Sequence, residues 1–148
     1  MPKDFLVASE GFLAEELKTA IKDFIELKGK FKDIFNIINR ATKWGITIQS
    51  PEIEKIIEDG ILYFIKRLLH YPFQITIIQA MNSLLEISSL LKYEFNLFAI
   101  QNLFFKILAL KLPELDHADL THELKKKILV EYRKASEKLL FSKNIEKL

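Results

Sequence analysis

The fold is decided by residues 73–112, which read FQITIIQAMNSLLEISSLLKYEFNLFAIQNLFFKILALKL. Five of these residues are charged, namely Glu86, Lys92, Glu94, Lys106 and Lys111. In residues 95–108, apolar side chains occur at almost every angle of a helix, and such a helix must be covered on all sides, by its own chain or by a partner. The sequence therefore predicts an all-α fold, an up-and-down bundle of about five helices around a buried apolar central helix.

The segment that precedes this stretch is predicted to supply covering helices. Apolar residues recur at spacings of three and four from Leu13 to Ala41, which favours one long helix that begins after an N-cap at Ser9 and bends at Gly29. Two shorter helices are the alternative. Gly45 is expected to end this region in a left-handed C-terminal cap, because glycine adopts that conformation without strain.

Capping residues and prolines predict the other boundaries. Ser50 and Pro51 are typical of a helix start, and Pro72 of a helix end. A third helix is expected over residues 73–91. The remaining predicted boundaries are an N-cap at Asn96, a helix end at Pro113 and an N-cap at Asp119.

Composition favours one domain, residues 1–148, of a soluble cytoplasmic protein. The chain has no cysteine, which excludes disulfides and thiolate zinc sites. Twenty-two basic and 20 acidic residues give a net charge of +2, so nucleic acid is not an expected partner, and the basic run at residues 125–127 is interpreted as a solvated helix face. The charge-free apolar runs are shorter than the ~20 residues that cross a bilayer, so no membrane partner is expected.

The sequence lacks recognisable catalytic and metal motifs. His117 and His122 are five residues apart, which does not place them on one helix face. The sequence does not carry the two Glu-x-x-His pairs that a di-iron bundle needs, and it has neither a nucleophile elbow nor a glycine-rich phosphate loop. We therefore expect no enzymatic activity, no metal and no cofactor.

Polar residues that interrupt the apolar helix are the candidate site. They are Asn96, Gln101, Asn102 and Lys106. A buried amide must find partners, so these residues either bond neighbouring helices or line a groove for a ligand or a partner. The aromatic residues expected to form an interface are Phe95, Phe98, Phe104 and Phe105.

Residues 84–91, followed by EFNLFAIQNLFF at residues 94–105, resemble the C-terminal helical region of proteins related to family 57 glycoside hydrolases. The likeness covers residues 43–108. It implies an all-helical module that packs beside a catalytic barrel, with α-glucan metabolism as the context. The barrel is absent from these 148 residues, so the resemblance implies no hydrolysis by this chain alone. Phe98 stands where the family pattern has Trp, which puts the transfer of ligand contacts in doubt.

Three functional hypotheses follow. The first is a non-catalytic helical interaction module that forms a homodimer or docks to a larger protein, because residues 73–112 carry more apolar surface than two amphipathic neighbours cover. The second is a small-ligand or glycan-binding bundle that uses Gln101 and Asn102. The third is weak nucleic-acid binding through the basic last helix, with an affinity that falls steeply with salt.

Overall fold

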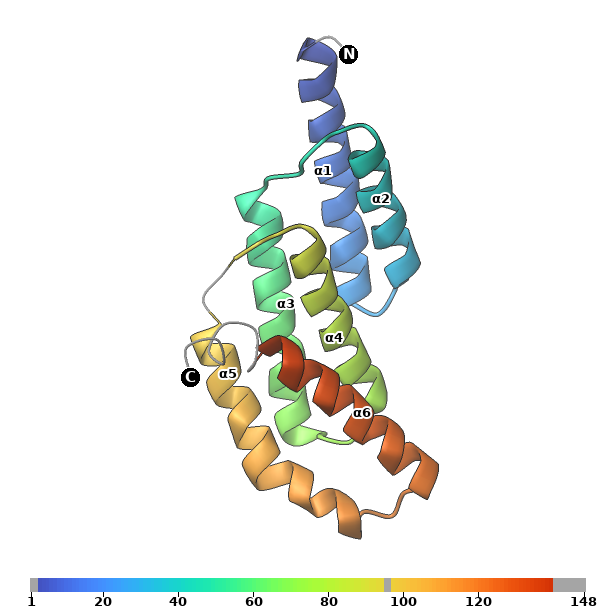
Figure 1. Cartoon of the computed structure of the whole chain (residues 1–148), viewed down its shortest axis with the longest axis vertical. Coiled ribbons are helices and arrows are strands. Elements are labelled where there is room, and N and C mark those ends of the chain that lie inside the picture. Colours follow the sequence, from blue (N-terminus) through green and yellow to red (C-terminus); the bar gives the residue numbers. More distant parts are fainter. Residues whose placement is uncertain (1–2, 95–96, 140–148) are drawn as a thin grey trace. The chain divides into compact units, whose positions relative to one another are not determined.

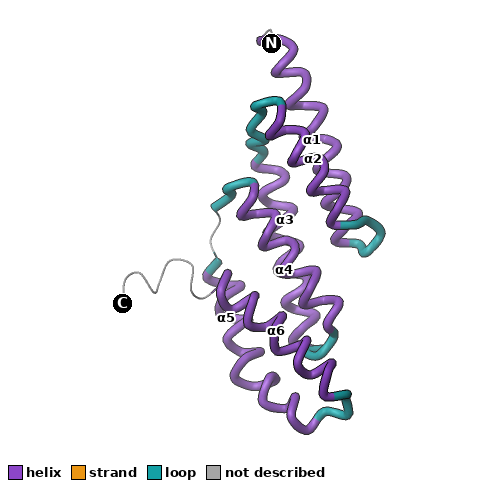
Figure 2. The backbone as a smooth tube through the Cα atoms, turned by 45° about the vertical axis from the view of Figure 1, so that its right-hand side comes forward, coloured by secondary structure: helices purple, strands orange, loops and turns teal. Residues whose placement is uncertain are grey.

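The computed structural model describes residues 3–94 and 97–139, with side chains from residue 7 onward. The described residues form six α-helices and no strand, which confirms the all-α fold (Figure 2). A π-helical segment, Ile107–Lys111, and a 3-10 helix, Leu112–His117, follow α5 directly. None of the described helices is long and apolar enough to cross a membrane. The six helices are α1 (Lys3–Ile25), α2 (Phe31–Lys43), α3 (Pro51–His70), α4 (Ile75–Leu90), α5 (Phe98–Lys106) and α6 (His122–Leu139).

The chain divides into two compact units. Unit 1 contains Met1–Asp59 and Ile87–Glu94, and unit 2 contains Gly60–Glu86 and Phe95–Leu148. The divisions fall within α3 and α4, so each of these helices contributes residues to both units. The single domain over residues 1–148 stays a prediction.

In unit 1, α1 and α2 lie side by side as an antiparallel pair (Figure 1). Two ion pairs connect α1 to its neighbours. The Arg40 guanidinium of α2 donates to the Glu16 carboxylate of α1, and Lys18 Nζ of α1 lies 2.7 Å from a carboxylate oxygen of Glu52 in α3. Because such partly exposed pairs contribute little, burial of apolar side chains supplies most of the stability of this contact. The buried residues are Leu13, Leu17 and Ile21 of α1 and Ile34, Ile37, Ile38 and Ala41 of α2.

The prediction of one long helix from Ser9 to Ala41 is wrong. The chain leaves helical geometry after Ile25 because Leu27 adopts a left-handed conformation, with φ +63°. The amides of Leu27 and Lys28 then donate back to the carbonyl oxygens of Phe24 and Asp23, at 3.0 and 2.8 Å, which is the Schellman pattern of a helix end. The alternative of two shorter helices is the correct one. The N-cap at Ser9 is wrong as well, because this residue lies inside α1.

Two other helices end in the same pattern within unit 1. Gly45, with φ +67°, follows α2, and the amide of Ile46 donates to the carbonyl of Ala41 at 2.8 Å, which confirms the predicted cap. Lys92, with φ +57°, follows α4, and the amide of Tyr93 donates to the carbonyl of Ser88 at 3.0 Å. A left-handed residue is common after a helix, but lysine in that position is strained.

In unit 2, α6 packs against α4 and α5. The Tyr132 hydroxyl donates to the carbonyl of Pro72, and its ring stacks on Phe104 with centroids 6.1 Å apart. Lys138 Nζ lies 2.9 Å from Glu86 Oε2 of α4. The fully buried stripe of α6 consists of Ile128, Tyr132, Ala135 and Leu139.

The expected buried central helix is wrong for α5. Its buried side chains are Ile100 and Phe104, followed by Ile107 in the π-helical segment, and these form one narrow stripe. Phe98, by contrast, is 67% exposed. The helix α3 buries a longer stripe instead, and the side chains of this stripe each expose 1% or less of their surface. They are Ile53, Ile57, Ile61, Phe64, Ile65 and Leu68.

The other predicted boundaries have mixed outcomes. Ser50 caps α3 as predicted, because its hydroxyl oxygen accepts a bond of 3.2 Å from the amide of Ile53. Pro113 does not end the helical path, which continues as a 3-10 helix to His117. The N-cap of α6 is Thr121 and not Asp119, because the Thr121 hydroxyl accepts the amide of Leu124 at 3.2 Å. The cap predicted at Asn96 lies outside the described residues.

Candidate functional site

Four of the predicted site residues lie together on one exposed face of α5. Phe98, Asn102, Phe105 and Lys106 are all exposed, at spacings of four, three and one that keep them on one side of a helix. Phe98 is 67% and Phe105 is 55% exposed. We define the α5 face as the exposed residues Phe98, Ala99, Asn102, Phe105, Lys106, Ala109 and Leu110.

Two predicted site residues point to the protein interior instead. Gln101 Nε2 donates a bond of 2.6 Å to the backbone carbonyl of Leu139 at the end of α6. Phe104 is fully buried against Tyr132, so its assignment to an interface with a partner is wrong. Gln101 therefore fixes α5 to α6, which was one of its two predicted roles. Phe95 and Asn96 lie outside the described residues.

The α5 face extends into the π-helical segment. A π turn is rare and is often found at functional sites. Here it keeps Ile107 buried while Leu110 is 66% exposed. The one charged residue of the face, Lys106, has no carboxylate within ion-pairing distance among the described residues. The face therefore presents apolar groups, one amide and one ammonium.

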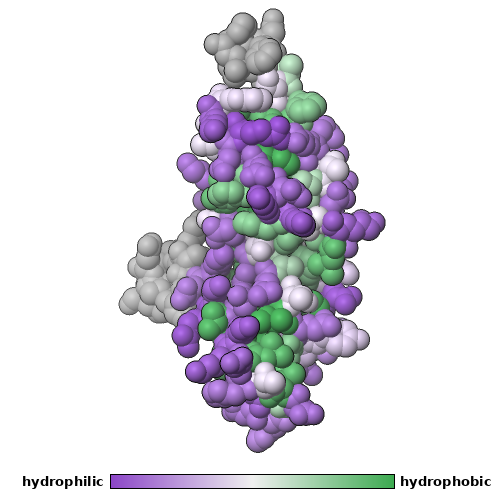
Figure 3. All heavy atoms as spheres, turned by 90° about the vertical axis from the view of Figure 1, so that its right-hand side faces the viewer, coloured by the Kyte–Doolittle hydropathy of each residue, from purple (hydrophilic) through white to green (hydrophobic). Residues whose placement is uncertain are grey.

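Exposed apolar side chains also occur elsewhere on the protein. Phe12 of α1 is 68% exposed, and Figure 3 shows hydrophobic side chains that reach the surface among hydrophilic ones on another side. The α5 face differs because three large apolar residues follow each other along one short helical segment, with alanine between them and no acidic residue. Such a continuous run is typical of an interaction site.

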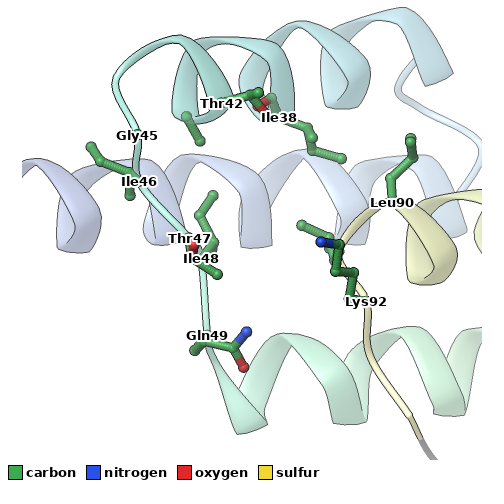
Figure 4. A pocket seen from close by; sticks show the side chains of 11 residues that line it. Ile38, Thr42, Gly45, Ile46, Thr47, Ile48, Gln49, Leu90 and Lys92 are labelled. Atoms are coloured by element: carbon green, nitrogen blue, oxygen red, sulfur yellow. The ribbon is translucent and has the colours of Figure 1, made fainter.

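Unit 1 contains a cavity of about 370 Å³ that sequence reasoning missed (Figure 4). It lies beside the end of α2, the connector of residues 45–49 and residues 90–92 after α4. Its buried apolar residues are Ile38, Ala41, Ile46, Ile48 and Leu91. Its exposed polar side chains are Thr42, Thr47, Gln49 and Lys92.

The sequence signal that could have indicated this cavity is the alternation of apolar and polar residues at positions 46–49. Ile46 and Ile48 point inward while Thr47 and Gln49 are exposed, as expected of an extended segment. The Tyr93 hydroxyl donates a bond of 3.0 Å to the carbonyl of Ile48, which holds the connector close to the end of α4. Burial raises the pKa of Tyr93 above the usual tyrosine value, so the phenol stays a neutral donor.

A second cavity of about 450 Å³ lies between α1 and α2 in unit 1. Glu16, Asp23, Asp33 and Arg40 are among its lining residues. Arg40 donates to Oε1 of Glu16, whereas the buried Oε2 of Glu16 has no hydrogen-bond partner among the described residues. No group of three or more His or carboxylate side chains in the described part of the chain is placed to hold a metal ion.

A buried amide in unit 2 was also missed. Asn82 of α4 is 6% exposed, and its Nδ2 donates to the backbone carbonyl and to the carboxylate of Glu131 in α6, each at 2.9 Å. Lys134 pairs with the other oxygen of that carboxylate at 3.2 Å. Both hydrogen bonds of the Asn82 amine go to α6, so we infer that they fix the position of α4 along α6, whereas the buried Oδ1 of Asn82 has no hydrogen-bond partner among the described residues. One asparagine in an apolar helix is a weak signal in the sequence.

Comparisons with known proteins supply no relative. No family model, no curated protein and no solved structure matches this chain. The α5 face and the two cavities are therefore interpreted from their own geometry.

Proposed function

We propose that this protein is a non-catalytic helical interaction module that self-associates through the α5 face. The observation that supports it is the exposure of Phe98, Phe105 and Leu110, at 67%, 55% and 66%, along one short helical segment. A helical segment that is apolar on most sides must be covered by its own chain or by a partner. Among the described residues, α5 buries one stripe and exposes large apolar side chains on the opposite side.

Covering the exposed rings of Phe98 and Phe105 gives a free energy that is large enough to matter for dimerisation. If a phenylalanine presents roughly 200 Å², the exposed fractions of 67% and 55% for Phe98 and Phe105 leave roughly 240 Å² on each copy. Covering both rings on two copies is then worth about 12 kcal/mol at ~25 cal/mol per Å². Association costs about 4–15 kcal/mol. The two rings about balance that cost, so Leu110 and the alanines decide how tight the dimer is.

A second copy of the chain fits the chemistry of the face. In an antiparallel two-fold arrangement Phe98 of one copy lies opposite Phe105 of the other, and Asn102 lies close to the axis. An asparagine amide both donates and accepts hydrogen bonds, so two of them can pair across the axis. Lys106 would lie about 7 Å along the helix from the axis, which separates the two ammonium groups by about 13 Å. This exceeds the Debye length of about 8 Å at physiological salt, so their repulsion is small.

In this proposal the helices form an up-and-down bundle. One side of α5 then faces its own chain, and the other side faces the partner. The resemblance to the helical region of family 57 glycoside hydrolase-related proteins would make a larger protein the alternative partner. Binding of nucleic acid through α6 has less support, because Glu123, Glu131 and Glu137 are interspersed with its basic residues.

The test is the mass of the protein in solution by light scattering, from micromolar to millimolar concentration. We expect a monomer–dimer equilibrium in the unmodified chain. Phe105→Ser should weaken dimerisation at least about 100-fold, because covering this ring on both copies is worth about 5 kcal/mol. Phe12→Ser is the control on α1, since Phe12 is even more exposed than Phe105, at 68% against 55%. A monomer at every concentration, or equal effects of the two substitutions, would refute self-association through the α5 face.

A further inference from the structure

The cavity of about 370 Å³ in unit 1 combines an apolar floor with a single cation. Ile46, Ile48 and Leu91 are among the floor residues, and Lys92 is the one charged residue that lines the cavity. Figure 4 shows the Lys92 amine and the Gln49 amide on different segments of the chain that line the cavity. An apolar cavity with a few convergent polar groups is the usual form of a small-molecule site, and this volume is at the small end of the usual range.

The Lys92 ammonium is free to accept an anion. No carboxylate lies within ion-pairing distance of it among the residues that the structure describes. By contrast, Lys18 and Lys138 are both engaged by carboxylates of neighbouring helices. The polar groups beside Lys92 are the side chains of Thr42, Thr47 and Gln49, of which the Gln49 amide is a hydrogen-bond donor.

The backbone at Lys92 strengthens the case for a role of its side chain. Lys92 occupies the left-handed position after α4, with φ +57°, where glycine is free of strain. A lysine there destabilises the fold and contributes no ion pair among the described residues. Lys92 combines this strain with a place in the lining of the cavity, and strained residues cluster at binding sites.

We propose that this cavity binds a small apolar monocarboxylate, such as a medium-chain alkanoate. The hydrocarbon chain lies against Ile46, Ile48 and Leu91, while the carboxylate accepts hydrogen bonds from the Lys92 ammonium and the Gln49 amide. One cation matches one negative charge, and the apolar floor disfavours highly hydrated dianions such as phosphate. The site lies in unit 1 and does not depend on the α5 face.

The test compares octanoate, 1-octanol and octylamine by amide chemical-shift titration, with octanol below its solubility limit and the two ions below their micellar concentrations. Octanoate should shift the amides of residues 45–49 and 90–92 and should bind up to about five-fold more tightly than octanol, because a partly exposed charge contact is worth no more than that factor. Octylamine should bind more weakly still. Equal binding of octanoate and octanol, or shifts confined to other residues, would overturn the proposal.

Two glycine substitutions separate binding from stability. Lys92→Gly should raise the melting temperature by removing backbone strain. It should also weaken the binding of octanoate about five-fold, because the ammonium is lost. Leu27→Gly is the matched control, because Leu27 has φ +63°, is 67% exposed and does not line the cavity. It should raise the melting temperature and leave octanoate binding unchanged. Lys92→Gln, which keeps a side chain but no charge, should also weaken binding. Unchanged octanoate affinity in both Lys92 variants would refute the site.

Discussion

Tyr132→Phe tests the packing of α6 in unit 2 by removing one oxygen atom. Tyr132 is 1% exposed, and its hydroxyl donates to the carbonyl of Pro72, in the turn between α3 and α4. The phenylalanine ring keeps its stacking on Phe104, so the change removes the hydrogen bond and little else. Loss of a buried hydrogen bond costs about 1–2 kcal/mol when the acceptor is left without a partner. We expect a decrease of that size in the free energy of unfolding near neutral pH.

The same substitution should behave differently at alkaline pH. Burial raises the pKa of Tyr132 above its usual value, whereas a tyrosine in the unfolded chain titrates near ~10. Above that pH the unfolded chain loses a proton that the folded chain retains, so the contribution of Tyr132 is present below pH ~10 and decreases as pH rises. At pH 11 this linkage favours the unfolded chain by about 1.4 kcal/mol. The deficit of Tyr132→Phe should therefore shrink by about that amount.

The assay is urea unfolding followed by circular dichroism at about pH 8 and about pH 11, with both proteins studied side by side. Tyr63→Phe is the control at a tyrosine that is 48% exposed, and it should change the free energy of unfolding by less than about 0.5 kcal/mol at the lower pH. A deficit for Tyr132→Phe that is the same at both pH values would contradict the pKa argument. No deficit at either pH would contradict the hydrogen bond itself.

Two further predictions concern backbone and capping, both measured by urea unfolding. Gly45→Ala should destabilise the protein by about 1–2 kcal/mol, because Gly45 has φ +67° and alanine is strained there. Gly11→Ala should stabilise the protein by about 0.5–1 kcal/mol, because Gly11 lies inside α1 and alanine favours the helix. An added Cβ at either glycine meets no atom within 4 Å, so equal effects would show that the left-handed conformation is wrong. Thr121→Ala should cost about 1 kcal/mol and Asp119→Ala almost nothing, since Thr121 caps α6; the reverse order would move the cap to Asp119.

The sequence predicts a helix end correctly where the residue type is strongly favoured in the conformation that the helix end requires. Gly45 and Ser50 were identified because glycine and serine are favoured in those positions for a local physical reason. Leu27 and Lys92 end α1 and α4 in the same left-handed conformation, with φ +63° and +57°, but nothing in a leucine or a lysine signals it. The hydrophobic spacing also continued across residues 26–30, and this produced the erroneous single helix.

The candidate site could be predicted only in part, because periodicity does not identify which side of a helix is covered. Phe98, Phe104 and Phe105 are the same residue type, yet the structure buries Phe104 and exposes the other two. Their distinction depends on where α6 packs, and that contact forms between residues such as Gln101 and Leu139, which are distant in the sequence. The cavity in unit 1 was missed because it requires the connector of residues 45–49 and Lys92 to meet.

The apolar excess of residues 73–112 predicts cover by the chain itself or by a partner, and α4 and α5 differ in how much of it the described chain buries. In α4 it is buried by the chain itself, with Ile78, Met81 and Leu84 fully covered. In α5 about half of it remains at the surface. The free energy gained per unit of apolar area is similar whether the covering surface belongs to the same chain or to another, so a sequence pattern cannot distinguish the two. An all-round apolar helix with one exposed side therefore favours association with another chain.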